Sequence, residues 1–95
     1  MENQYLWELN ARYYSLRKFL FEENETSYIF EDEEGRKNFL SKKYFQNDIF
    51  YNKYNDIYYG FDREKILETA IAQSKAEDNI SILEKILKKL KNEIW

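Results

Sequence analysis

Apolar side chains near the start of the chain recur at intervals of three and four residues. The positions are Leu6, Leu9, Tyr13, Leu16 and Leu20. This spacing places all of them on one stripe of an α-helix. Nearby aromatic residues widen the stripe beyond what a single contact surface needs. The pattern therefore predicts a helix over residues 4–23 that packs against neighbours on two sides.

A longer seam with the same spacing fills the C-terminal third of the chain. Its positions are Ile66, Thr69, Gln73, Ala76, Ile80, Leu83, Leu87, Leu90 and Ile94. Asp62 is placed to cap the first turn, and Phe61 before it is placed to pack on Ile66, four residues into the helix. Because the phase is unbroken, the seam predicts one helix of about 32 residues. The alternative is a break near Asp78 and a second helix that begins at Asn79 or Ser81.

Between these two predicted helices, the pattern changes to short runs of β-branched and aromatic residues. Residues 26–31 form one such run and predict a strand. Residues 49–51 and 57–59 form two more, separated by a polar turn of five residues. These two runs predict an antiparallel hairpin.

Residues 33–45 are open to two interpretations. Asp32 can cap a short helix over this range, because acids follow it and lysines lie near the end. Alternatively, Glu34 and Gly35 form the turn of a hairpin. The predicted fold class, for a single domain over residues 1–95, is α+β and mainly helical. Two long helices, N-terminal and C-terminal, flank a short antiparallel sheet.

Charge is unevenly distributed along the chain. The net charge is −3, from 15 basic and 18 acidic residues, which argues against a protein that holds duplex DNA mainly by neutralising phosphates. Residues 25–35 carry five acids and no basic residue, whereas residues 36–61 carry five basic residues and two acids. An acidic patch therefore precedes a basic and aromatic one.

The residues that most often carry enzyme chemistry are missing. The chain has no histidine and no cysteine, which removes the usual general base and the commonest metal ligands. Gly35 and Gly60 are 25 positions apart, too far to form a phosphate-binding loop. The acids of residues 31–34 lack the alternating spacing of a calcium loop. We therefore expect no enzyme activity, no cofactor and no metal.

The location of the protein is predicted from two further absences. No run approaches the roughly 20 apolar residues that a membrane span requires, and residues 1–4 lack the features of a signal peptide. The lack of cysteine fits a reducing compartment. We expect a cytoplasmic protein, in the host-cell cytoplasm if a phage encodes it, with no membrane partner.

The strongest compositional signal is aromatic: nine tyrosines, seven phenylalanines and two tryptophans. Filling a thin core is one explanation. However, a two-stranded hairpin with aromatic residues on both faces cannot bury them all, and exposed tyrosines are typical of protein interfaces. We therefore expect the partner-binding residues to be Glu31, Asp32, Glu33, Glu34, Lys42, Lys43, Tyr51, Lys53, Tyr54, Tyr58 and Tyr59.

These features predict a small inhibitor that binds a larger protein or a ribonucleoprotein. The aromatic patch would be the anchor, and the acidic residues would pair with cations of the partner. In size, charge mix and lack of catalytic groups, the chain resembles the small inhibitors that phages carry, including anti-CRISPR proteins, and the immunity proteins that neutralise toxins. This resemblance covers the general character of the whole chain and implies no roles for single residues.

Two alternatives come from different classes of function. The first is a single-stranded RNA-binding module, in which lysines contact phosphates and aromatic rings stack on bases. The second is a structural homodimer, in which the C-terminal seam pairs with its copy as a coiled coil. The predicted oligomeric state is accordingly a monomer or a homodimer.

Overall fold

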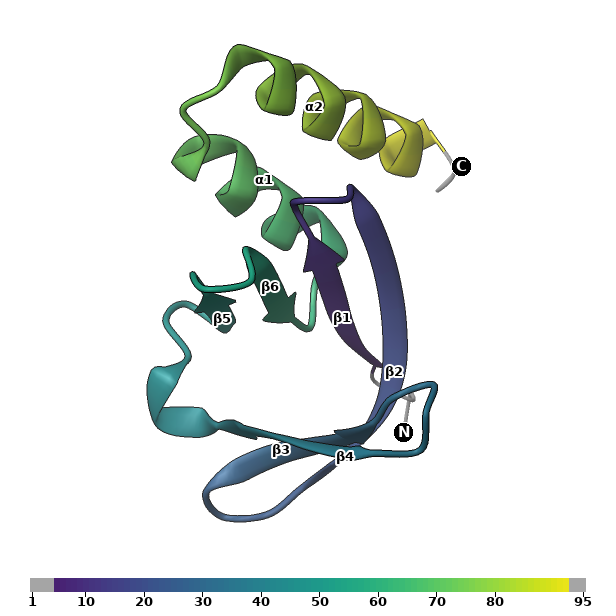
Figure 1. The fold of residues 1–95 in the computed structure, drawn as a ribbon, viewed down its shortest axis with the longest axis vertical. Helices are drawn as coiled ribbons and strands as arrows, with labels where there is room; N and C mark the ends of the chain where they lie inside the picture. Colours follow the sequence, from purple (N-terminus) through teal and green to yellow (C-terminus); the bar gives the residue numbers. More distant parts are fainter. Residues whose placement is uncertain (1–4, 93–95) are drawn as a thin grey trace.

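The computed structural model describes residues 5–92 and shows a fold built mainly on strands. The elements are β1 (Tyr5–Asn10), β2 (Ser15–Glu23), β3 (Ser27–Glu31), β4 (Lys37–Ser41), the 3-10 turn η1 (Lys42–Tyr44), β5 (Ile49–Asn52), β6 (Ile57–Gly60), α1 (Arg63–Gln73) and α2 (Glu77–Asn92). The strands form one antiparallel sheet in the order β4-β3-β2-β1-β6-β5. The sheet curls, so that β3 and β4 turn away from β1, and the helices lie at the β1–β6 end (Figure 1).

The predicted N-terminal helix is wrong, because β1 and β2 form a hairpin over that segment. Leu6 and Leu9 are both fully buried, but they belong to different core clusters on opposite faces of the sheet. Tyr13 and Leu20, which the predicted stripe placed in the core, are 73% and 66% exposed. Nearly every second residue of this segment is apolar, so a helical spacing and a strand alternation can both be found in it.

The turn between β1 and β2 has a clear local cause. The side-chain oxygen of Asn10 accepts hydrogen bonds from the backbone N–H groups of Arg12 (3.1 Å) and Tyr13 (3.3 Å). Tyr14 then takes the left-handed conformation, with φ of 56°. An asparagine that bonds to the backbone two and three residues later competes with a helix and favours a turn.

The predicted single C-terminal helix is also wrong, because the chain breaks into α1 and α2. Ser74 leaves the helical conformation, with ψ of 140°, and α2 begins at Glu77. The alternative, a break and a second helix, is therefore correct, but the break lies at residues 74–76 and the second helix begins earlier than Asn79 or Ser81. It lets α2 fold back, so that Leu83 and Leu90 are buried within the chain.

The local signals around α1 have mixed outcomes. The Asp62 cap is confirmed, since its carboxylate accepts from the N–H groups of Glu64 (2.9 Å) and Lys65 (3.3 Å). The predicted contact of Phe61 with Ile66 is wrong. Phe61 packs with the aromatic rings on the other side of the sheet, whereas Ile66 belongs to the core cluster on the helix side. Gln4 and Ile94, at the outer ends of the two predicted helical segments, lie outside the described residues.

The middle of the chain is closer to expectation. The strand over residues 26–31 is confirmed as β3, and the hairpin of residues 49–59 is confirmed as β5 and β6. The helix over residues 33–45 is wrong, and the alternative hairpin is correct. Gly35 provides the positive φ of 81° that the β3–β4 turn requires. The predicted fold class, two long helices that flank a short sheet, is therefore wrong. The structure has a sheet of six strands, and both helices follow it in the sequence.

The core is divided between the two faces of the sheet. On the helix side, a cluster that includes Leu9, Tyr58 and Leu67 is closed by α1 and α2. On the other side, Leu6, Phe30 and Leu40 are buried among rings. Those rings are Phe19, Phe21, Phe45, Phe50, Tyr59 and Phe61. Much of the aromatic content is therefore used to fill the concave face of the curled sheet, where no helix packs.

Candidate interaction surface

A groove of about 670 Å³ runs beside β5, the strand at one edge of the sheet. We call it the tyrosine groove. It is lined by Tyr44, Gln46, Asn47, Ile49, Phe50, Tyr51, Asn52, Lys53, Tyr54, Thr69 and Gln73. These residues come from η1, from the turn before β5, from both faces of β5, from the β5–β6 loop and from α1. Because residues on both faces of β5 contribute, the groove follows the edge of the strand.

Two tight turns position the strand that lines this groove. Before β5, Asn47 and Asp48 both have positive φ, of 52° and 66°, which asparagine and aspartate tolerate better than most residues. Their turn is closed by paired backbone hydrogen bonds between Gln46 and Ile49. After β5, the side chain of Asn52 accepts from the N–H of Tyr54 at 3.0 Å. Asparagine and aspartate at the ends of β5 therefore determine its short length.

The β5–β6 loop is also held from outside. The N–H of Ala11 donates to the carbonyl of Asp56 at 2.9 Å, and the guanidinium of Arg12 donates to the carbonyl of Tyr54 at 3.3 Å. Both donors belong to the β1–β2 turn. These hydrogen bonds hold the backbone at Tyr54 in place, although the Tyr54 side chain is exposed to solvent.

Three tyrosines around the groove are exposed to solvent. Tyr44 is 61%, Tyr51 40% and Tyr54 82% exposed. Lys43 lies over the ring of Tyr44, with its ammonium 5.1 Å from the ring centroid, and Lys53 lies 5.8 Å from that of Tyr54. Each pair combines an apolar ring with a cation, which is a favourable contact of about 0.5–1 kcal/mol at exposed sites.

Of the other two tyrosines that we expected to be partly exposed, Tyr58 is buried in the core and Tyr59 is partly buried. Tyr58 is only 3% exposed; it stacks on Tyr51 with the ring centroids 4.3 Å apart and donates a hydrogen bond to Gln73 at 2.9 Å. Tyr59 lies on the opposite face, packed against Phe30 and Phe50. The hairpin therefore buries Tyr58 on the face that the helices cover and partly buries Tyr59 on the face that the curled sheet encloses.

Burial changes the acidity of these two groups. The pKa of Tyr58 is raised by burial, and further by Tyr51 and Asp56; the pKa of Tyr59 is raised by burial and by the neighbouring Glu8. The folded protein therefore holds both phenolic protons more tightly than the unfolded chain does. Their contribution to stability is complete below about pH 10, where free tyrosine ionises, and is lost as the pH rises through the raised values.

We accordingly expect the urea midpoint of unfolding to fall as the pH rises above about 10. Tyr58→Phe should reduce the slope of this fall, because one of the two groups no longer ionises in the unfolded state. Tyr13→Phe, at an exposed tyrosine, is the matched control and should keep the wild-type profile. Equal slopes for Tyr58→Phe and the wild type would contradict the assignment.

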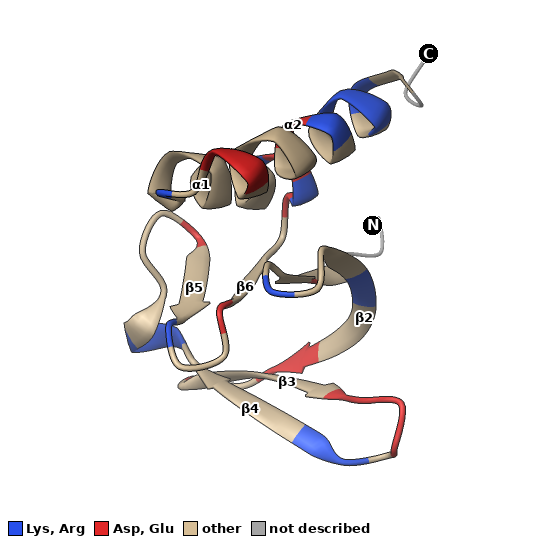
Figure 2. Cartoon of the chain, turned by 45° about the horizontal axis from the view of Figure 1, so that its top comes forward, with Lys and Arg blue, Asp and Glu red and all other residues tan. Residues whose placement is uncertain are grey.

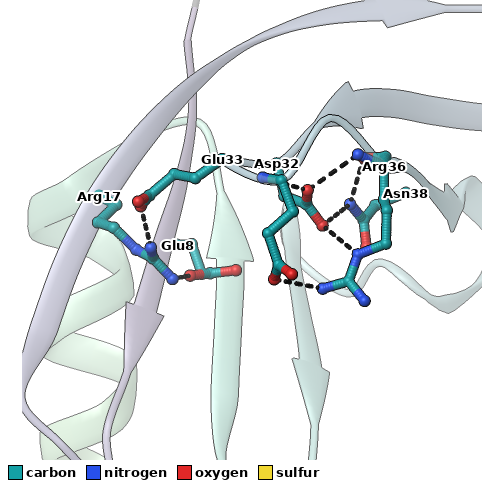
Figure 3. Close-up of polar contacts among 7 residues, drawn as sticks. Glu8, Arg17, Asp32, Glu33, Arg36 and Asn38 are labelled. Carbon is teal, nitrogen blue, oxygen red and sulfur yellow. Dashed lines mark hydrogen bonds and ion pairs between the residues drawn. The ribbon is translucent and has the colours of Figure 1, made fainter.

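The predicted acidic patch forms the β3–β4 turn, which lies at the other end of β4 from η1 (Figures 1 and 2). Its side chains are already engaged, as Figure 3 shows. Arg17 pairs with Glu33 and, at 3.0 Å, with the buried Glu8. Arg36 pairs with Glu34 at 2.7 Å and with Asp32 at 3.4 Å.

Asp32 also organises the backbone of this turn. Its carboxylate accepts from the N–H groups of Arg36 (3.0 Å) and Glu34 (2.9 Å) and from the side chain of Asn38 (3.2 Å). The backbone bond from Arg36 is the largest cause of its lowered pKa. Glu31 is exposed beside them. Asp32, Glu33 and Glu34 thus stabilise the turn, and less negative charge is available to a partner than the sequence suggests.

The predicted lysines separate in the same way. Lys42 pairs with Glu23 at 2.5 Å and lies 5.0 Å from the ring centroid of Tyr28, away from the groove residues. Lys43 and Lys53 lie at the groove beside Tyr44 and Tyr54. Of the predicted partner-binding residues, the structure therefore brings together Lys43, Tyr51, Lys53 and Tyr54.

Sequence reasoning missed part of this surface. Tyr44 follows two lysines, but Phe45 directly after it packs in the ring cluster, so the sequence alone did not show which of the two rings is exposed. Thr69 and Gln73 had no signal either, because they reach the groove only once α1 packs beside β5 and β6. The polar positions of the predicted helical seam are the ones that meet the groove.

Comparisons with known proteins add no relative: no protein-family model, no curated protein and no solved structure matches this chain. Within residues 5–92, no three acidic side chains gather in a way that could hold a metal ion. None of the helices in that range is long and apolar enough to cross a membrane.

Proposed function

We propose that this protein is a non-enzymatic binding protein that attaches to a larger protein through the tyrosine groove. The observation that carries the proposal is the exposure of Tyr44, Tyr51 and Tyr54 around one concavity. Tyrosine offers a large apolar ring, a polar tip and few rotatable bonds, so covering it gives binding energy at low entropic cost. Aromatic anchors of this kind commonly dominate the energy of a protein interface.

Folding does not explain two of these residues, Tyr44 and Tyr54. Phe45, Phe50 and Tyr59 pack in the ring cluster of the concave face, whereas Tyr44 and Tyr54 keep most of their surface in water. Tyr44 reaches only the edge of that cluster, with its ring centroid 6.2 Å from that of Phe50. Exposed aromatic rings at a concavity are typical of sites that another molecule covers.

The charges at the groove favour a protein partner over single-stranded RNA. Lys53 is the one charged residue that lines the groove, with Lys43 beside it. The flanking Asp48 and Asp56 are acidic. A surface that follows a phosphate backbone needs several cations along its length, and binding in that mode depends steeply on salt. Tyrosine stacking with two lysines remains the specific feature in favour of RNA as the second candidate.

Binding of this kind supports an inhibitory role without catalysis. A chain of 95 residues that covers a surface of a larger protein blocks whatever that surface contacts. An ordinary protein interface buries about 800 Å² on each partner, an area that this small protein can supply. The general resemblance to phage inhibitors and toxin-immunity proteins supports the same proposal.

The test replaces two of the anchors together. We expect Tyr44→Ala/Tyr54→Ala to leave the free energy of unfolding within about 0.5 kcal/mol of the wild type, since exposed positions contribute little to stability. The affinity for the partner should fall at least about tenfold, which corresponds to about 1.4 kcal/mol. The partner is first trapped in host cells by a photo-crosslinking residue placed at position 54 and is then purified for calorimetry.

Phe39→Ala is the matched control, because Phe39 is 62% exposed on β4 and does not line the groove. It should bind the partner with wild-type affinity, and a crosslinker at position 39 should not trap it. Full affinity of the double variant would contradict the proposal. A purified partner that is RNA, with affinity lost at high salt, would replace it by the second candidate.

A further inference from the structure

The outer edge of β5 presents backbone groups that are free to pair. Ile49 directs both its N–H and its C=O to Gln46, on the side away from β6, at 3.0 and 2.8 Å. Backbone groups alternate in direction along a strand. The N–H and C=O of Tyr51, two residues further on, therefore also point away from β6, toward the outer edge.

Nothing within residues 5–92 pairs with that edge at Tyr51. β5 is the last strand in the sheet order, and the turn at Gln46 covers only its first residue. Unpaired edges of sheets are ready to accept another strand, and proteins usually protect them. Here the short length of β5 and the neighbouring Lys53 limit the exposed edge to about one pair of groups.

The groove provides walls for a chain that would lie along this edge. Tyr44 of η1 stands on one side, and Thr69 and Gln73 of α1 stand on the other. Side chains of an added strand alternate between these two walls, because successive residues point to opposite faces. The apolar ring of Tyr44 and the polar side chains of α1 then favour an apolar residue on one side and a polar one on the other.

Charge indicates the kind of segment that fits. Among the described residues, the lining of the groove includes no carboxylate and one charged residue, Lys53. The two acids that flank the groove are already engaged: Asp48 pairs with Lys65 at 3.9 Å, and Asp56 accepts a hydrogen bond from the Tyr51 hydroxyl at 3.0 Å. Within the described part of the chain, neither Lys43 nor Lys53 forms an ion pair. Two cations at the rim without carboxylate partners are complementary to acidic side chains.

We propose that the tyrosine groove binds an extended, acidic peptide segment of the partner, which adds to β5 as a further strand. The main chain of Tyr51 donates and accepts the central pair of hydrogen bonds. The rings of Tyr44 and Tyr54 cover apolar side chains, and Lys43 and Lys53 pair with acids. This inference rests on the proposed function and specifies its mode of binding. Strand addition of this type combines main-chain affinity with side-chain specificity.

The test starts from a display library of random ten-residue peptides selected against the full chain. We expect the selected peptides to be enriched in aspartate and glutamate and to alternate apolar with polar positions. Their affinity should fall at least tenfold for the Tyr44→Ala/Tyr54→Ala variant and stay unchanged for Phe39→Ala. Absence of binders, or binders without acidic enrichment, would overturn the proposal.

Hydrogen exchange then separates strand addition from mere contact. On saturation with the best selected peptide, the amide of Tyr51 should exchange at least tenfold more slowly. The amide of Phe50, which pairs inward with β6, is the control and should change little. N-methylation of successive peptide amides should weaken binding at one position, that of the amide that donates to the carbonyl of Tyr51, and not at the adjacent positions. Unchanged exchange at Tyr51, or equal effects at adjacent positions, would refute strand addition.

The outcomes also distinguish this inference from the proposed function. If the partner depends on Tyr44 and Tyr54 but the selected peptide does not compete with it, strand addition fails and the proposed function stands. If neither depends on the tyrosines, both fail. A dimer in light scattering at micromolar concentration, dissociated by the peptide, would show that a second copy occupies the edge and would overturn the assignment to a partner segment.

Discussion

Leu9→Ala should lower the free energy of unfolding by about 2–5 kcal/mol, whereas Leu20→Ala should lower it by less than about 0.5 kcal/mol. Leu9 is fully buried between the sheet and the helices, so its removal leaves a cavity. Leu20 keeps 66% of its surface in water on β2. The same substitution at these two positions therefore has very different effects.

This pair of variants tests the fold directly, because a helix over residues 4–23 would bury both leucines on one stripe. Urea unfolding at pH 7, followed by far-ultraviolet circular dichroism, gives both free energies. Similar large losses for Leu9→Ala and Leu20→Ala would contradict the β1–β2 hairpin. A small loss for Leu9→Ala would contradict the packing of β1 beneath the helices.

Gly60→Ala should lower the free energy of unfolding by about 1–3 kcal/mol through overpacking. A Cβ at this position would lie 3.0 Å from the side chain of Ile66 and 3.1 Å from the carbonyl oxygen of Asp48. The first can move, but the second belongs to the turn before β5. β6 therefore passes closely between α1 and that turn, and the missing side chain of Gly60 makes this possible.

A double-mutant cycle with Ile66→Ala checks the cause, because this change removes both Ile66 atoms that approach the added Cβ. If steric overlap produces the loss, the shorter side chain should recover at least about 0.5 kcal/mol of it beyond the cost of Ile66→Ala alone. Gly35→Ala serves as the comparison. A Cβ added at Gly35 would lie 3.7 Å from its nearest neighbour, so the loss would come from the backbone φ of 81° and not from overpacking. Its loss of about 1 kcal/mol should show no coupling to Ile66. Additive effects for Gly60 and Ile66 would contradict the close approach.

Local sequence signals were sufficient for several elements. The strand at residues 27–31, the hairpin of β5 and β6, and the Asp62 cap each depend on contacts between residues close in the chain. For the β3–β4 turn, the sequence offered both a helix and a hairpin, and Gly35 was the residue that favoured the hairpin. At the surface, Tyr51 and Tyr54 were expected to be exposed, and they are.

Tertiary contacts decided the rest of the surface. Tyr58 could not be distinguished from Tyr51 by sequence, because the two are partners across the β5–β6 hairpin on the same face. Their exposure differs since the helices cover Tyr58 in the inner strand and leave Tyr51 at the edge. The acidic turn looked like a free negative patch because Arg17, its main distant partner, lies 16 residues before Glu33.

The sequence by itself determined the strand at residues 27–31, the β5–β6 hairpin and the Asp62 cap of α1, and it excludes histidine and cysteine chemistry. Only the tertiary structure decided that residues 5–23 are strands, that the C-terminal seam folds back on itself, and which tyrosines face water. The reason is that a strand forms its hydrogen bonds with segments that are distant in sequence. Leu9 of β1 pairs with Tyr58 of β6, which lies 49 residues later in the chain. A helix forms its hydrogen bonds locally and can be predicted from spacing alone. Where apolar residues are dense, however, helical spacing occurs by chance, and helices are then predicted where none forms.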